Sequence, residues 1–568
     1  MQTIGGPGGQ QPLKWWADGD RPVHKDSRVT YLVDGRTTML MMCRHFITAC
    51  DYIYLANWGL TPGMKLVRGS DHRAGPDGSP AQEALLADLR ASGFSEADIH
   101  FWQTHHLSVQ EVLGYAVSKN VEVKVLLWSS PALFSHYDPR QAHEQLSAVG
   151  VTCVLDDSAE GILHHPVESL HQKITIIDGA YAFVGGVDPL IEAQGDYDRW
   201  DTHDHPFFTP LRRAQSGLSP HPWHDAHALI EGPASADVEW NFRERWNDVL
   251  QRHHRDQRQM VLERLPAPPL PSQTFTQVAR TIPEHTYSFK PLVIRGIAQL
   301  YANALSNIQH CVYLENQYLW LHAYLGLDVP FVSIDNSEME HNIRLLGEAL
   351  RRGAIVSLIL PDHPNVGRAF TDQGLNLLRN EAPQAVEEGR LQAFSLGTST
   401  YWDQDGREHY RPIYVHAKVA IVDDLWTTVG SGNLNNRGMR DDTEMNVATL
   451  DRGLAHDLRL RLQAEHLGLV SAEDLHLVAR LHCGLIRTEG ERGRAVQVLG
   501  YLEQQLGDPR VALRMMHTRA WENLARYKAN QPLVGHLLPY LSAEEAVQQG
   551  LPFREEHGWL EEPESLTV

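Results

Sequence analysis

The sequence is poor in cysteine and in long apolar runs, and both shortages exclude classes of protein. Its five cysteines are an odd number and form no CxxC pair, so neither a disulfide framework nor a zinc ribbon is expected. Residues 1–30 hold no apolar core of the signal-peptide type, and no later stretch reaches about 18 uncharged apolar residues. We therefore expect a cytoplasmic protein whose contact with a membrane is at most peripheral.

Excess positive charge is also lacking. Asp and Glu number 71 against 50 Lys and Arg, which gives a formal net charge of −21. Nonspecific nucleic-acid binding usually needs a basic domain or stripe, so no nucleic-acid partner is expected. With 568 residues, 42% of them hydrophobic, the chain is long enough for two or more domains with sizeable cores.

One stretch of the sequence occurs twice. "HQKITIIDGAYAFVGGVD" (171–188) aligns without a gap with "HAKVAIVDDLWTTVGSGN" (416–433), with His, Lys, Asp and a glycine at the same offsets. Around each copy, strand-like runs alternate with helix-like runs, a pattern typical of a layered α/β fold. The chain is therefore predicted to contain two homologous α/β halves.

A proline-rich stretch separates the two halves. Such a stretch continues neither a helix nor a central strand. We expect a first half at 1–262, a linker at 263–275, a second half at 276–450, and a helix-rich extension at 451–568 without a counterpart in the first half.

The repeated histidines and lysines suit the chemistry of a phosphodiester. Side chains alternate along a strand, so His171 shares a face with Lys173, and His416 with Lys418. Lysine charges stabilise the negative charge that builds on a pentacoordinate phosphorus. One neutral imidazole can attack phosphorus while another group protonates the leaving alcohol. The lysines supply the positive charge, so we expect neither a metal ion nor a cofactor.

The other repeated positions have different expected roles. By the same alternation, Asp178 and Asp423 face away from the histidines and are predicted to be structural anchors. The second strand of each copy ends in small residues whose N–H groups, with one amide side chain, could bind a substrate oxygen. These predicted substrate-binding residues are Gly185, Gly186, Ser431 and Asn433.

At these residues the sequence resembles the phospholipase D superfamily, whose HxK(x)4D(x)6G(G/S) signature is present twice. The segments "PWHDAHALIEGPA" (222–234), "YLENQYL" (313–319) and "RDDTEMN" (440–446) look like parts of the plant- and animal-type phospholipases D. The lipid-binding modules that precede the catalytic region in those enzymes have no similar segment here. The resemblance implies two α/β/α sandwich halves packed about a pseudo-twofold axis.

The resemblance also implies an activity and roles for residues. His171 would form a phosphohistidine, His416 would protonate the leaving group, and Asp201 and Glu444 would each orient the histidine of their own half. The substrate would be a phospholipid at a membrane surface, cleaved to phosphatidic acid and headgroup alcohol. Water or a primary alcohol would be the acceptor, and no stable protein partner is implied.

Several alternatives stay open. A relative with another phosphodiester substrate, either a nuclease or a phospholipid synthase, would carry the same motifs, and so would a noncatalytic lipid-binding relative. His363 could line the pocket, although a loop histidine is the simpler interpretation, and the apolar segment 320–340 is expected to pack on its own domain. A crowd of histidines shows no fixed metal-ligand spacing, so we expect no metal site there: His203, His205, His221, His224 and His227.

Overall fold

Two β-sheets with the same strand order form the frame of the protein. The structure, a computed structural model, describes residues 14–130, 137–159, 168–192, 197–213, 220–254, 257–321, 337–362, 367–554 and 558–560. The first sheet runs in the order β2 (Arg28–Val33), β9 (Ala226–Glu231), β7 (Tyr181–Gly185), β6 (Ile174–Ile177), β3 (Tyr52–Asn57), β4 (Glu122–Trp128) and β5 (Thr152–Asp156). The second repeats that order in β10 (Phe275–Ile282), β19 (Glu444–Leu450), β18 (Trp426–Gly430), β17 (Lys418–Val422), β12 (Cys311–Asn316), β13 (Ile355–Ile359) and β14 (Leu391–Trp402).

The pairing register repeats together with the order. In the β6–β7 hairpin Ile174 pairs with Val184, and in the β17–β18 hairpin Val419 pairs with Val429. Each hairpin therefore begins at the same offset from its motif histidine. The tandem α/β fold predicted from the repeated sequence is confirmed.

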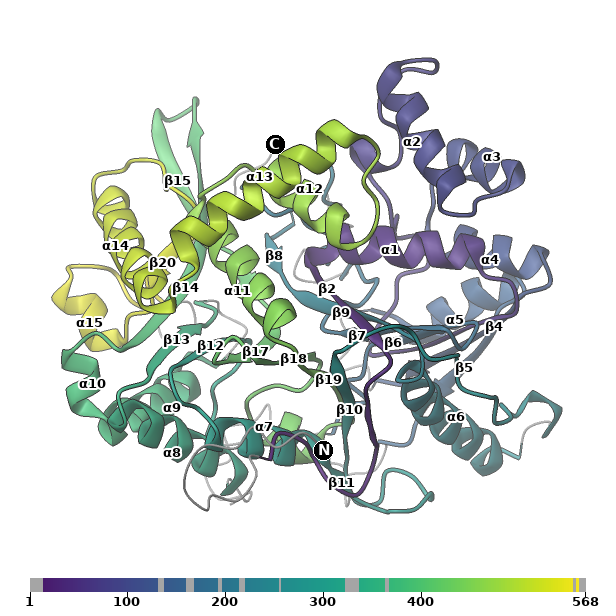
Figure 1. Cartoon of the computed structure of the whole chain (residues 1–568), viewed down its shortest axis with the longest axis horizontal. Coiled ribbons are helices and arrows are strands. Elements are labelled where there is room, and N and C mark those ends of the chain that lie inside the picture. The colour runs from purple at the N-terminus through teal and green to yellow at the C-terminus, as the bar shows by residue number, and fades with distance from the viewer. Residues whose placement is uncertain are drawn as a thin grey trace.

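The two sheets pack face to face and share one core. Strands β7 and β9 lie against β18 and β19, and a single apolar cluster joins side chains of both sheets, among them Ile174, Val184, Val419 and Val429. Burying this apolar surface holds the halves together. Figure 1 shows the first half, in purple and blue, beside the second, in teal and green.

Helices cover the outer faces of the sheets. Apolar clusters join the first sheet to α1 (Asp34–Thr48) and α4 (Val109–Ser118), and the second to α7 (Gly296–Ser306), α8 (Ser337–Arg351) and α9 (Arg368–Glu381). The other helices of the two halves are α2 (Pro80–Ala91), α3 (Glu96–Thr104), α5 (Pro139–Ala148) and α10 (Pro383–Glu387).

One helix on the inner face of each sheet extends the repeat. Helix α6 (Ser235–Arg252) follows β9 and packs on β3, β6 and β7, whereas α11 (Arg452–Leu467) follows β19 and packs on β17 and β18. The expectation that 451–568 has no counterpart in the first half is therefore wrong for α11. A boundary drawn at 450 from the sequence cuts this inner layer, and we propose that the second half runs to Leu467.

One strand near each end of the described chain also joins the sheet of the second half. Strand β1 (Val23–His24), within the range predicted for the first half, pairs with β10, and β20 (Leu537–Pro539) pairs with β14. Further short strands are β8 (Trp223–His224), β11 (Ile294–Arg295), β15 (Arg407–Pro412) and β16 (Tyr414–Val415), and the C-terminal helices are α12 (Ala472–His482), α13 (Glu489–Leu506), α14 (Pro509–Lys528) and α15 (Ala543–Gln548). Among the described residues, every helix is too short or too polar to cross a membrane.

The motif aspartates clamp the start of a neighbouring strand in each half. Asp178 accepts three backbone N–H bonds, at 2.8–2.9 Å, from Cys50, Asp51 and Tyr52. Asp423 does the same, at 2.7–2.8 Å, for Gln309, His310 and Cys311. Both aspartates have positive φ, 53° and 54°, a conformation that Asp and Asn tolerate better than most residues. Each clamp ties a motif hairpin to the strand beside it.

Replacing the clamp should destabilise the fold. We expect Asp178→Ala to lower the free energy of unfolding by about 2–4 kcal/mol, because three charge-assisted hydrogen bonds are lost and Ala is strained at positive φ. Asp178→Asn should cost about half as much, since one acceptor oxygen remains. Denaturant titration followed by circular dichroism measures both, with the exposed Asp403→Ala as control. Equal stability of Asp178→Ala and the control would contradict the clamp.

Candidate active site

The two motif histidines face each other where the halves meet. Their ring centroids lie 6.4 Å apart. Each histidine stands just before its β-strand, and its backbone pairs with the other half: the His171 N–H donates to the Thr443 carbonyl at 2.9 Å, and the His416 N–H to the His224 carbonyl at 2.8 Å. These two backbone hydrogen bonds join the start of each motif to the opposite half.

Each histidine is held by a carboxylate of the opposite half. The Nδ1 atom of His171 lies 2.9 Å from Oε1 of Glu444, and Nδ1 of His416 lies 2.7 Å from Oδ2 of Asp225. Both carboxylates are fully buried. With Nδ1–H donated to a carboxylate, the Nε2 atom of each ring is left with a lone pair, which is the arrangement that a nucleophile or base requires.

The sequence-based pairing of acids with histidines is wrong in both halves. Glu444 contacts His171 rather than His416. Asp201 lies elsewhere, 3.2 Å from Nδ1 of His205 and 3.0 Å from Nη1 of Arg212. The physical reason is that each half-site closes across the junction, so an acid later in the same half cannot reach its own histidine.

Asp225 was missed, and the sequence does contain a signal for it. Asp225 immediately precedes β9, and Glu444 begins β19, the equivalent strand of the second half. Two residues further on, His227 pairs with Gly185 and Asn446 pairs with Gly430. Aligning the strand that follows each motif, rather than searching for the nearest acid, would have identified Asp225.

The two lysines are buried in unlike surroundings. The Lys173 ammonium donates to the His171 carbonyl at 2.7 Å and lies 3.3 Å from Oδ2 of Asp188, whereas that of Lys418 donates to Oε1 of Gln317 at 3.1 Å. Burial lowers the pKa of both lysines, and that of Lys418 falls to about 7. Because its neighbour Gln317 is neutral, the positive charge of Lys418 is less neutralised than that of Lys173 and is more available to an incoming anion.

Both imidazoles are neutral in the resting site. Burial lowers the pKa of His171 and of His416 well below the usual value, and the two lysines lower each further. Burial, with Asp442 nearby, raises the pKa of the Glu444 carboxyl. The His171 side chain is 14% exposed and that of His416 5%, so His171 is the more accessible of the two to a substrate.

The two glycines of the first motif have another use than the predicted one. The N–H of Gly186 already donates to the Ala226 carbonyl at 2.9 Å. A Cβ on Gly186 would meet Oδ1 of Asp225 at 2.0 Å, and one on Gly185 would meet Nδ1 of His227 at 2.4 Å. These positions are glycine because the strand carrying the acid passes directly over them.

Ser431 and Asn433 lie at the equivalent place in the second half. Ser431 exchanges hydrogen bonds with the backbone of Met445: its N–H donates at 2.9 Å, and its Oγ accepts from the Met445 N–H at 3.0 Å. The Oδ1 atom of Asn433 is buried and makes no hydrogen bond with the described residues. Of the four predicted substrate-binding residues, Asn433 best fits that role.

Two arginines outside the repeated motifs add positive charge to the site. Arg199, paired with Glu192, stacks on the Trp223 ring at 3.8 Å and lowers the pKa of His416. Arg437, held by Asp442 at 2.9 and 3.0 Å, lowers the pKa of His171. The junction is thus a positive, water-poor site, suited to an anionic group placed between two imidazoles.

Two sequence-based predictions concern residues outside those that the structure describes. His363 and residues 322–336 of the apolar segment are not among the described residues.

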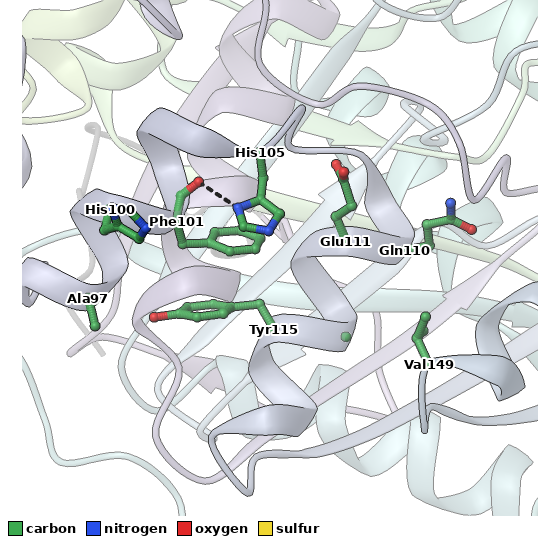
Figure 2. A pocket seen from close by; sticks show the side chains of 9 residues that line it. Ala97, His100, Phe101, His105, Gln110, Glu111, Tyr115 and Val149 are labelled. Atoms are coloured by element: carbon green, nitrogen blue, oxygen red, sulfur yellow. Dashed lines mark hydrogen bonds between the residues drawn. The ribbon is translucent and has the colours of Figure 1, made fainter.

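A separate hollow lies apart from the active site. Figure 2 shows this hollow on α3 and α4, where the Phe101 ring stacks on His105 and on Tyr115. It is lined by Ala97, His100, Phe101, His105, Gln110, Glu111, Gly114, Tyr115 and Val149.

Comparison with known proteins identifies sequence relatives that are named phospholipase D. A family model described as "Cardiolipin synthase, PLD-like domain" matches residues 324–465. "Phospholipase D A" of Dictyostelium discoideum is 26% identical over 64% of this chain and 32% of its own length. "Phospholipase D alpha 1" of Zea mays is 26% identical over 64% and 58%, and "Phospholipase D1" of Schizosaccharomyces pombe 22% over 80% and 36%.

The chain spans less than two thirds of the length of these relatives. Among solved structures, a phosphatidylserine synthase of Haemophilus influenzae Rd KW20 matches with 14% identity and a TM-score of 0.43, covering 88% of this chain and 93% of that one. Nuc of Salmonella typhimurium, a phospholipase D family member, matches with 16% identity and a TM-score of 0.22, covering 34% and 93%. Both motifs are intact, and the chain is similar in sequence to proteins named phospholipase D.

Binding of a phosphate analogue should weaken as Lys418 loses its proton. Below a pH of about 7 Lys418 is protonated, and above it the ammonium charge is lost. We expect the affinity for tungstate to fall about tenfold between pH 6 and pH 9, as measured by isothermal titration calorimetry. Lys418→Met should bind weakly at every pH, whereas the variant Lys25→Met, at an exposed lysine, should follow the unmodified protein. A constant affinity across this range would contradict the shifted lysine.

Proposed function

We propose that the protein is a phospholipase D, which hydrolyses the distal phosphodiester of a glycerophospholipid to phosphatidic acid and headgroup alcohol. The observation that carries this proposal is the pair of crossed imidazole–carboxylate contacts, His171 with Glu444 and His416 with Asp225, beside two buried lysines. The phospholipase D names of the sequence relatives support the choice of substrate class.

In the first step His171 is the nucleophile. Its Nε2 attacks phosphorus, a P–N bond forms, and the P–O bond to the headgroup breaks. The negative charge of the substrate offsets the lysines and raises the pKa of His416, so that this imidazole arrives protonated. His416 then gives its Nε2 proton to the departing headgroup oxygen, while Asp225 stabilises the imidazolium. Lys173 and Lys418 stabilise the charge on the non-bridging oxygens.

In the second step the roles of His416 reverse. The now neutral imidazole takes a proton from water, and the resulting oxygen nucleophile attacks the phosphohistidine. The P–N bond breaks and phosphatidic acid leaves, which returns His171 to its neutral form. His416 is left protonated, and it releases this proton to solvent when the anionic product departs. A primary alcohol in place of water would give a phosphatidyl alcohol by the same route. Because the substrate lies in a bilayer, we propose peripheral contact with a membrane surface.

The assay uses phosphatidylcholine vesicles with ethanol. We expect phosphatidic acid and phosphatidylethanol from the unmodified protein, and a loss of at least about 10³-fold in His171→Ala, because this variant lacks the proposed nucleophile. Thin-layer chromatography with mass spectrometry quantifies both products, and denaturing gels of protein quenched after mixing with labelled lipid detect the phosphoenzyme.

Three other outcomes would change the proposal. Cleavage of DNA without cleavage of lipid would select a nuclease. Absence of product from any diester would select a noncatalytic lipid-binding protein. A phosphoenzyme that still formed in His171→Ala would transfer the nucleophilic role to His416.

The crossed pairing predicts which carboxylate matters. Glu444→Gln and Asp225→Asn should each lower kcat by about 10²–10⁴-fold, because an amide cannot hold the imidazole in the required tautomer or stabilise its cation. Asp201→Asn should lower kcat less than tenfold, since Asp201 contacts His205 and Arg212 rather than either motif histidine. Steady-state kinetics on vesicles distinguishes the three variants. A larger loss in Asp201→Asn than in Asp225→Asn would refute the crossed pairing.

A further inference from the structure

Behind the active site, side chains from distant parts of the sequence converge on one buried point. Asp34 starts α1, His205 lies in a loop, His224 belongs to β8 and Glu465 to α11. Each offers one ligand atom, and these atoms all lie within 4.8 Å of one another and are buried. The four residues will be called the buried His–carboxylate cluster.

The atoms of this cluster are spaced as metal ligands would be. Oε1 of Glu465 lies 3.1 Å from Nδ1 of His224 and 3.3 Å from Nε2 of His205. Asp34 approaches the same two nitrogens at 3.1 and 3.7 Å. Ligands about 2.1 Å from a tetrahedral Zn²⁺ are separated by about 3.4 Å. The cluster needs little adjustment to surround an ion.

A second observation is independent of that spacing: each imidazole is oriented from behind by another carboxylate. While Nε2 of His205 faces the cluster, its Nδ1 lies 3.2 Å from Asp201. While Nδ1 of His224 faces the cluster, its Nε2 lies 2.8 Å from Glu315. Histidines that bind metals usually donate their other N–H to a carboxylate in this way, which fixes the tautomer and the ring orientation.

A third imidazole lies against the same carboxylates. Nδ1 of His203 is 3.1 Å from Oδ2 of Asp34 and 2.8 Å from Oε2 of Glu465, and its buried Nε2 makes no hydrogen bond with the described residues. Three ring nitrogens thus point at two carboxylates in a place that water does not reach. Positive charge, from the imidazoles themselves or from a bound cation, has to offset these buried negative charges, because isolated charges are costly there.

We propose that the buried His–carboxylate cluster binds a divalent transition-metal ion through Asp34, His205, His224 and Glu465. Two imidazoles and two carboxylates in a compact, closed site match a structural Zn²⁺ best among the common ions. The ion is structural rather than catalytic, because the site is closed and the histidines of the motifs lie outside it.

Such an ion would join three parts of the chain behind the reaction centre. Asp34, His205 and His224 belong to the first half, Glu465 to the inner helix of the second half, and Glu315 lies on β12. His224 directly precedes Asp225, the residue that holds His416. The ion would therefore fix the helix α11 and the acid of one half-site together.

The test measures metal in the full-length protein, expressed with added zinc and purified without chelators. Inductively coupled plasma mass spectrometry should find about one zinc per chain. Removal with dipicolinate should lower the melting temperature, and Zn²⁺ or Co²⁺ should restore it. The Co²⁺ form should show the visible bands of a tetrahedral site without the near-ultraviolet band of a thiolate ligand.

Variants identify the ligands. His205→Gln and His224→Gln should each lower the zinc content at least tenfold, and Glu315→Gln should weaken zinc affinity about 10–100-fold through loss of the orienting carboxylate. His45→Gln is the matched control, because His45 is a partly buried histidine on α1 that bonds only the Met41 carbonyl at 2.8 Å among the described hydrogen bonds. It should retain one zinc.

Either of two results would overturn the proposal. The first is less than about 0.1 zinc per chain in the unmodified protein together with no thermal shift on addition of Zn²⁺, which would mean that imidazolium–carboxylate pairs fill the cluster. The second is a full zinc content in both histidine variants. If these variants do not fold, X-ray absorption on the unmodified zinc protein decides, since imidazole and oxygen scattering supports the site and sulfur scattering refutes it.

Discussion

A carboxylate on one half of the molecule holds an imidazole on the other, and the rest of the structure depends on this crossed contact. Glu444 and Asp225 are fully buried, and a buried carboxylate without a partner would cost several kcal/mol. Docking the halves supplies both partners at once, and it also buries the apolar core shared by the two sheets. Assembly of the catalytic site and assembly of the fold are therefore the same event.

The pseudo-twofold symmetry is broken in its charges. Asp188 and Asn433 occupy the same offset after the two motif histidines, but one is an acid beside Lys173 and the other a neutral amide. The half with the acid also carries the more exposed histidine. A symmetric scaffold thus provides two different environments, as a reaction with a nucleophile and a separate proton donor requires.

The sequence predicted those features that depend on the order of residues within a short segment. The repeat from His171 to Asp188 predicts the hairpins and the shared face of histidine and lysine, because these follow from offsets within a few residues. Asp225 was missed because an acid was sought in the same half as each histidine, whereas the contact crosses the junction. The equivalence of α11 to α6 was missed because it is visible only in their matching places on the two sheets. The cluster of Asp34, His205, His224 and Glu465 has no sequence spacing to detect, since it forms only when four segments meet.

The crossed contact also has a consequence for inheritance. The acid that serves His171 is encoded 273 residues downstream, in the other repeat, and the acid that serves His416 191 residues upstream. Neither repeat can lose its acid without silencing the histidine of its twin. The two copies therefore cannot diverge as independent enzymes do, and a harmful variant in one repeat has to be interpreted through the chemistry of the other.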